Sequence, residues 1–183
     1  MPVADRQLAR SLAQLVCPGV VKCRLNGNSL EVKAIYNNGT TPGLSFNNCR
    51  VLYFNENKNE LLVGTEGGGL NILKLDDHRQ EVIEVSVYMK DDSPNSISNN
   101  YVRAIMTDYQ GNTWVGTYEG LNKLIRDESS NSIVFRSYTQ REGLPNNMVQ
   151  LITEGENGEL WIGTNNGLCK FNTDTEKFVR YSI

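Results

Sequence analysis

Histidine is nearly absent from this chain of 183 residues, which has one, His78. Long apolar runs are also absent: no stretch approaches the ~20 residues that a membrane helix needs, so we expect no membrane segment. Asp5, Arg6 and Arg10 interrupt what would have to be the apolar part of a signal peptide. Neither charge sign dominates, with 18 Lys+Arg against 21 Asp+Glu. Without clustered basic residues, nucleic acid is not an expected partner.

The shortage of histidine also limits the chemistry of the chain. His78 lies in a polar stretch, residues 76–80, which is typical of a solvated loop. One histidine cannot make a His-based metal cluster, and the 4 cysteines lack the CxxC spacing of a zinc site. No serine or cysteine has a candidate general base beside it. We therefore expect no catalytic residue, no metal and no cofactor.

Residues that build tight turns are abundant. Asparagine occurs 22 times and glycine 16 times, many of them as Asn-Asn, Asn-Gly or Gly-Asn. These residue types tolerate positive φ and therefore favour tight turns. Many turns in a chain of this length predict many short strands.

A segment of the chain occurs three times. The copies are NNCRVLYFNENKNELLVGT from Asn47, NNYVRAIMTDYQGNTWVGT from Asn99 and NNMVQLITEGENGELWIGT from Asn146. In each copy the Asn-Asn pair precedes Gly-Thr by the same 17 positions, and the copies start 52 and 47 residues apart. A repeat near ~40–50 residues is typical of a four-stranded propeller blade.

The pattern within one copy predicts its strands. Residues 102–107 form an apolar, β-branched run, residues 108–112 a turn, residues 113–117 a second strand, and a third strand begins at Leu121. A fourth strand closes each unit and carries a tyrosine, the four being Tyr36, Tyr88, Tyr138 and Tyr181. Arg103 and Gln150 occupy equivalent positions near the start of the first strand of their copies, and Val51 is expected at the same position in the remaining copy.

We therefore predict an all-β fold of about four β-propeller blades, each four-stranded and antiparallel. Blades are expected at residues 46–88, 99–138 and 146–183, with a half blade of third and fourth strands at 19–36. Residues 1–18 form an N-terminal segment, in which Leu8, Leu12 and Leu15 fit one face of a short helix over residues 4–16. The unmatched ends favour an excerpt of a larger propeller. The alternative is a compact ring of four blades, capped by residues 4–16.

The repeat carries a family resemblance. The motif V-x-x-I-x-x-D-x-x-G-x-x-W-V-G-T-x-x-G-L, from Val102 to Leu121 and in degenerate form from Val149 to Leu168, resembles the two-component regulator propeller repeat. The first copy departs from it, with Leu62 in place of the tryptophan. The resemblance implies the periplasmic sensor region of a Bacteroides-type hybrid two-component system protein. Such sensors recognise oligosaccharides and signal to a histidine kinase, which is not in this chain.

Propeller topology brings the Asn-Asn pairs to the same face as the loops that join second and third strands. Amide groups and an aromatic ring on this face suit hydroxyl-rich ligands. Asparagine is also a common turn residue, so a purely structural role is the alternative for the pairs. The candidate ligand-binding residues are Arg103, Gln150, Tyr118, Glu119, Asn165, Asn166, Asn100 and Asn147.

Three classes of function remain open. The first is a ligand-sensing module, binding an oligosaccharide and without catalytic activity of its own. The second is a protein-interaction or dimerisation scaffold, and we expect self-association through open blade edges in either case. The third is a propeller lyase or hydrolase, which would need a cluster of acid and base groups in the central channel.

Overall fold

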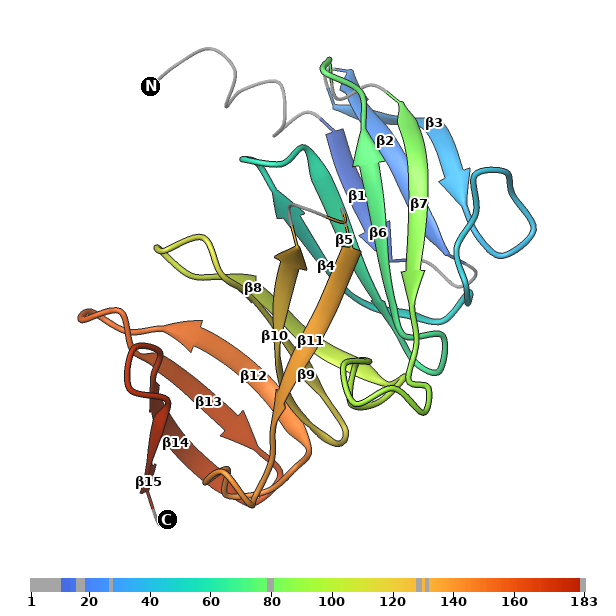
Figure 1. The fold of residues 1–183 in the computed structure, drawn as a ribbon. Coiled ribbons are helices and arrows are strands. Elements are labelled where there is room, and N and C mark those ends of the chain that lie inside the picture. The colour runs from blue at the N-terminus through green and yellow to red at the C-terminus, as the bar shows by residue number, and fades with distance from the viewer. Residues whose placement is uncertain are drawn as a thin grey trace.

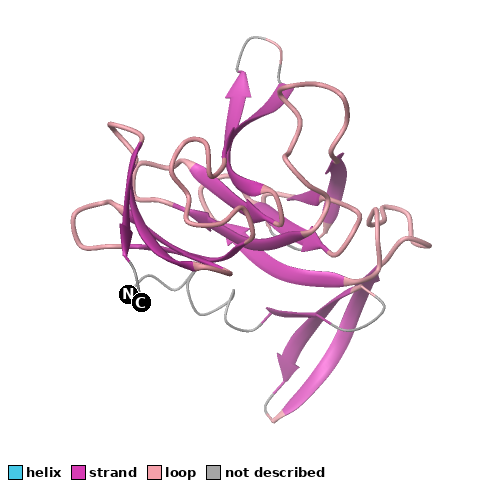
Figure 2. Cartoon of the chain, turned by 90° about the horizontal axis from the view of Figure 1, so that it is seen from below, coloured by secondary structure: helices cyan, strands magenta, loops and turns pink. Residues whose placement is uncertain are grey.

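The computed structural model describes residues 11–15, 19–26, 28–78, 81–127, 130 and 132–181. These residues form β-strands and loops, and none of them lies in a helix (Figure 1, Figure 2). The all-β prediction is therefore confirmed.

Four antiparallel sheets follow one another along the chain. The first contains β1 (Ser11–Leu15), β2 (Val20–Asn26) and β3 (Ser29–Tyr36). The second contains β4 (Cys49–Asn55), β5 (Glu60–Thr65), β6 (Leu70–Leu75) and β7 (Val82–Tyr88). The third contains β8 (Val102–Thr107), β9 (Thr113–Thr117), β10 (Gly120–Asp127) and β11 (Ser132–Tyr138). The fourth contains β12 (Val149–Glu154), β13 (Leu160–Thr164), β14 (Gly167–Asn172) and β15 (Lys177–Tyr181).

The sheets are arranged as propeller blades. Within each sheet, every strand pairs with its neighbour in sequence. Strand β8 contacts both β4 and β12, so these three are the inner strands of adjacent blades. The blades form an arc that does not close, with the first and fourth sheets at its two ends (Figure 1). This arrangement confirms the prediction of four-stranded antiparallel propeller blades.

The N-terminal segment differs from the prediction. Residues 11–15 form strand β1 rather than part of a helix, and the first sheet has three strands where two were expected. Strand β1 pairs with β2 from Ser11 opposite Arg24 to Leu15 opposite Val20. Pairing satisfies backbone groups of β2 that would otherwise lie at a sheet edge, whereas so short a helix is marginal on its own. Residues 4–10 and 16 of the predicted helix lie outside the described residues.

Three apolar clusters fill the spaces between adjacent blades. The cluster between the third and fourth sheets includes Trp114, Leu121, Tyr138, Ile162 and Phe171. The cluster between the second and third includes Leu62, Leu70, Ile97, Val115 and Phe135. The smallest, between the first and second, contains Val20, Leu44, Val63 and Leu73. The core is thus a series of wedges, each made by residues of two blades.

The glycines of the first two Gly-Thr pairs, Gly64 and Gly116, allow adjacent blades to approach closely. A Cβ atom at Gly64 would lie 2.5 Å from Val102 Cγ1, and one at Gly116 would lie 2.6 Å from Val149 Cγ1. Both distances are too short for real atoms, so a side chain cannot be added without moving the next blade. At Gly163 a Cβ atom would instead be 3.5 Å from Cβ of Leu151 in its own blade. Gly64 and Gly116 therefore each pack against a valine from the inner strand of the following blade.

Candidate functional site

Each inner strand of the three four-stranded blades is bulged at the same place. The pairing register shifts between Cys49 and Val51 in β4, between Val102 and Ala104 in β8, and between Val149 and Leu151 in β12. A β-bulge redirects the side chain of the extra residue and is common beside binding sites. The residues at these bulges are all polar: Arg50, Arg103 and Gln150.

This register corrects one equivalence drawn from the sequence. Val51 pairs with Gly64 and Ala104 pairs with Gly116, so Val51 is the counterpart of Ala104. Arg50, and not Val51, is therefore the counterpart of Arg103 and Gln150. The cause is one extra residue in the β4–β5 hairpin: residues 55–60 separate the paired Phe54 and Leu61, whereas residues 108–112 separate the equivalent pair, Thr107 and Thr113.

Arg103 connects three blades through its guanidinium group. Its Nε and Nη2 atoms donate hydrogen bonds of 3.0 and 2.8 Å to Oε1 of Gln150 in the fourth sheet. Its Nη1 atom lies 3.4 Å from the Tyr118 hydroxyl and 3.6 Å from Oε1 of Glu66, which follows β5. The side chain is 18% exposed. Arg103 is therefore held in place and still reaches solvent.

The loops between second and third strands begin in the same way in all three blades. The backbone N–H groups of Glu66, Tyr118 and Asn165 donate to the carbonyl groups of Asn48, Tyr101 and Met148, at 2.8, 3.2 and 3.1 Å. This shared geometry places the side chains of the three loop residues beside the bulges. We call the resulting row the polar ladder: Arg50, Glu66, Arg103, Tyr118, Gln150 and Asn165.

Contacts at its two ends complete the polar ladder. Glu66 accepts a 2.8 Å hydrogen bond from Asn48 Nδ2, and its other oxygen lies 3.7 Å from Nε of Arg50. At the opposite end, Gln150 Nε2 donates to Asn165 Oδ1 at 2.5 Å. In the middle, the rings of Tyr101 and Tyr118 stack at 5.0 Å between centroids.

Four of the eight predicted residues, Arg103, Gln150, Tyr118 and Asn165, are joined by these contacts. The others lie on the same side of the blades in different roles. Oδ1 of Asn100 accepts from the backbone N–H of Lys90 at 2.6 Å, and Oδ1 of Asn147 accepts from that of Gln140 at 2.8 Å. Both oxygens thus support turns. Glu119 and Asn166 are exposed loop residues.

Sequence reasoning missed Arg50 and Tyr101. Arg50 was hidden by the extra residue in the β4–β5 hairpin, because aligning the copies on Asn-Asn and Gly-Thr displaced it by one position. Tyr101 stands next to an Asn-Asn pair, and only the stacking on Tyr118 marks it as part of the site.

Two observations bear on catalytic chemistry in the part of the chain that the structure describes. No group of three or more His, Cys, Asp or Glu residues there could hold a metal ion. Burial raises the pKa of the Cys169 thiol to about 11, so it stays protonated at neutral pH and is a poor nucleophile.

No helix long and apolar enough to cross a membrane occurs among the residues that the structure describes.

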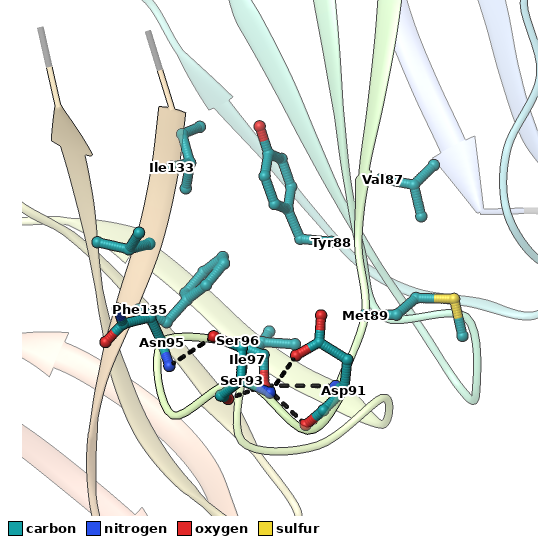
Figure 3. A pocket seen from close by; sticks show the side chains of 11 residues that line it. Val87, Tyr88, Met89, Asp91, Ser93, Asn95, Ser96, Ile97, Ile133 and Phe135 are labelled. Carbon is teal, nitrogen blue, oxygen red and sulfur yellow. Dashed lines mark hydrogen bonds between the residues drawn. The ribbon is translucent and has the colours of Figure 1, made fainter. Parts of the chain in front are cut away.

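A shallow cavity of about 270 Å³ lies away from the polar ladder, between the outer strands β7 and β11 (Figure 3). Tyr88 and Phe135 face each other across it edge to face, with centroids 5.7 Å apart. The loop that borders the cavity bonds mainly to itself: Ser93 N–H donates to Asp91 Oδ1 at 2.8 Å, and the Ser96 hydroxyl donates to the Ser93 carbonyl at 2.9 Å. The ladder and this cavity are therefore separate features.

Comparisons with known proteins match both the repeat and the fold. The family model of the two component regulator propeller matches residues 96–119 and 143–166. No curated protein matches the chain in sequence.

Several solved structures share the fold. The extracellular domain assigned to the hybrid two component system BT4673 from B. thetaiotaomicron superposes with a TM-score of 0.72 at 19% identity, over 94% of this chain and 23% of that one. The corresponding domain of BT3049 from the same organism gives 0.57 at 22% identity, over 93% and 28%. Virginiamycin B lyase from Staphylococcus aureus gives 0.55 at 14% identity, over 89% and 48%.

The chain thus spans about a quarter of the length of the two extracellular domains from B. thetaiotaomicron. The family match runs from the later part of the loop before β8 to the end of the β9–β10 loop, and over the same part of the next blade. These are the segments that supply Arg103, Tyr118, Gln150 and Asn165. Residues 96–119 and 143–166 are therefore two-component regulator propeller repeats, in a chain that folds as propeller blades similar to the extracellular domains of hybrid two-component systems.

Proposed function

We propose that this chain is a ligand-sensing segment of a two-component signalling regulator, that it binds an oligosaccharide on the polar ladder, and that it has no catalytic activity of its own. The regulator repeats and the likeness to extracellular sensor domains support the signalling role and a periplasmic location. A kinase output, if the regulator has one, lies outside this chain.

The observation that carries the proposal is the polar ladder itself. Hydrogen bonds and ion pairs run from Glu66 through Arg103 and Gln150 to Asn165, and so cross three blades. Amide and guanidinium groups beside stacked aromatic rings are the groups that bind sugar hydroxyls and sugar faces. Packing of the blades does not require such polar side chains, because the wedges between them are apolar.

Two other classes of function are less well supported. A lyase role would follow the likeness to virginiamycin B lyase, but at 14% identity that likeness concerns the fold alone. The polar ladder contains one carboxylate, Glu66, and no histidine, so it lacks a pair of acid and base groups. A protein-interaction scaffold remains the second candidate because apolar residues such as Leu151 are exposed on the fourth sheet.

Calorimetric titration of a panel of oligosaccharides tests the proposal. Tyr118→Ala and Arg103→Ala should each weaken binding by roughly 1–3 kcal/mol, as expected for loss of a stacking ring or of buried polar partners. Tyr109→Ala is the matched control, because Tyr109 is exposed in the turn at the opposite end of the strands. Equal affinities in all variants would exclude this face as the sensor surface and favour the scaffold.

A further inference from the structure

Two guanidinium groups share one carboxylate oxygen in the polar ladder. Oε1 of Glu66 lies 3.7 Å from Arg50 Nε and 3.6 Å from Arg103 Nη1. Both distances exceed the ~2.7–2.9 Å of a charge-assisted hydrogen bond. The shorter contact of Glu66, at 2.8 Å, is the one that its other oxygen makes with Asn48. Glu66 is therefore near both arginines without being firmly bound to either.

The charges of the polar ladder do not balance. Arg50 and Arg103 bring two positive charges and Glu66 one negative charge, while Tyr118, Gln150 and Asn165 are polar residues without a formal charge. Half of the Arg50 side chain is exposed, at 50%. An oxyanion approaching this point would meet one solvent-facing guanidinium and one that is partly covered, where attraction is less screened by water.

Arg103 keeps its orientation without help from Glu66. Its two hydrogen bonds to Gln150 and its contact with the Tyr118 hydroxyl fix the plane of the guanidinium. A donor that is already ordered loses little conformational entropy when it binds a ligand. Displacing Glu66 from this position would therefore leave Arg103 in place.

An aromatic surface adjoins the arginines. The Arg103 guanidinium carbon lies 5.6 Å from the centroid of Tyr118, and Tyr118 stacks on Tyr101, which is 43% exposed. A sugar ring offers an apolar face that packs on such rings. The ladder thus combines a place for an oxyanion with a surface for the sugar that carries it.

From this arrangement we propose that the ligand is an acidic oligosaccharide, whose carboxylate or sulfate oxyanion binds between Arg50 and Arg103 in place of the Glu66 carboxylate. The inference rests on the proposed sensing function and specifies its ligand class. Glu66 then acts as an internal competitor that occupies the site until the ligand arrives.

The test is a set of titrations with four probes: an oligogalacturonate, a neutral galactose oligomer of equal length, a sulfated form of that oligomer, and sodium sulfate. At least one acidic oligomer should bind about tenfold or more tightly than the neutral one, because paired charges add to the shared sugar contacts. Comparing the uronate with the sulfated oligomer identifies the oxyanion. Sulfate alone should bind weakly, since it lacks the sugar.

Substitutions locate the effect. Arg50→Gln and Arg103→Gln should each weaken acidic-oligomer binding by about tenfold or more, whereas Glu66→Gln should strengthen it by removing the competitor. Arg24→Gln and Glu84→Gln remove the same charges from the exposed surface of β2 and β7 and should leave affinity unchanged. Circular dichroism and thermal unfolding confirm that each variant is folded.

The outcomes separate the two proposals. Neutral and acidic oligomers that bind equally, through Tyr118 and without Arg50, would overturn the acidic ligand and leave the sensing function intact. If the Glu66→Gln variant bound the acidic oligomers more weakly than the unaltered chain, the proposal that the ligand displaces the Glu66 carboxylate would also be overturned. Absence of binding by all three oligomers would overturn both proposals.

Discussion

At the residue scale, Trp114 shows why one tryptophan of the repeat belongs to the core. Its side chain is fully buried, and its ring packs edge to face on Phe171 with centroids 5.4 Å apart. The indole N–H donates to Oδ2 of the buried Asp108 at 2.8 Å, and Oδ1 of Asp108 accepts from the backbone N–H of Asn112 at 2.8 Å. The tryptophan therefore joins the β8–β9 turn to the wedge between two blades.

Replacing Trp114 should destabilise the protein more than replacing its repeat counterpart. Trp114→Ala is expected to lower the free energy of unfolding by about 3–5 kcal/mol, because it empties packed volume. Trp161→Ala should cost less, since Trp161 is only partly buried and Gly155 stands in the place of Asp108. Urea denaturation followed by circular dichroism measures both. Equal losses of unfolding free energy in the two variants would contradict the prediction that the more buried tryptophan contributes more to stability.

At the element scale, two positions that contact each other differ together between blades: one lies in the loop before the inner strand and the other on the third strand. In the second sheet Asn71 accepts from Ser45 N–H at 2.8 Å, and in the third Asn122 accepts from Ser98 N–H at 2.9 Å. Both asparagines are fully buried. In the fourth sheet the equivalent positions hold Pro145 and Cys169. Proline has no N–H to donate, so a buried asparagine there would lose this partner.

This pairing predicts a non-additive double substitution. Cys169→Asn alone should lower the free energy of unfolding by about 1–3 kcal/mol, because it buries an amide without its donor. Adding Pro145→Ser supplies the N–H and the hydroxyl, and should recover part of that loss. A double-mutant cycle from thermal unfolding gives the coupling energy. A coupling energy near zero would contradict the pairing.

The same scale shows what the sequence could predict about the fold. Repeated Asn-Asn and Gly-Thr pairs mark the ends of strands, and so the inner strands β8 and β12 were located closely. Between these pairs, one extra residue in the β4–β5 hairpin shifted the register and hid Arg50. Strand β1 was missed because its leucine spacing fits a helix. Whether such a short segment forms a strand depends more on pairing with a neighbouring strand, here β2, than on its own periodicity.

The candidate site was predictable to a similar extent. Propeller topology alone places the start of each inner strand and the loop between second and third strands on one face. This was enough to predict Arg103, Tyr118, Gln150 and Asn165 as candidate ligand-binding residues. Side-chain contacts across blades, such as Glu66 with Arg103, depend on how adjacent sheets pack, and no repeat pattern contains that information.

At the scale of the whole molecule, both ends of the arc expose apolar side chains. Leu151 and Val179 on the fourth sheet are 57% and 55% exposed, and Leu30 and Val32 on β3 are 53% and 56% exposed. Adjacent blades cover such residues at the internal wedges. Exposed apolar sheet faces favour association of a chain with a second copy.

We therefore expect the 183-residue chain to self-associate in solution. Sedimentation velocity over a range of concentrations should show a shift to larger species, and Leu151→Lys should reduce it by placing a charge on the exposed face. Tyr109→Lys, on an exposed turn, is the control. A monomer at all concentrations would contradict this expectation.

The fit of Val102 against Gly64, and of Val149 against Gly116, gives the joints between blades a direction. Each joint takes its glycine from one blade and its valine from the next. Reversing the orientation of a blade would therefore break the glycine–valine contacts with both of its neighbours. A duplicate of residues 99–145 placed after residue 145 would offer its valine to Gly116 and its glycine to Val149. The interchangeable module of this chain is thus the segment from one Asn-Asn pair to the next, which carries the valine of one joint and the glycine of the following joint.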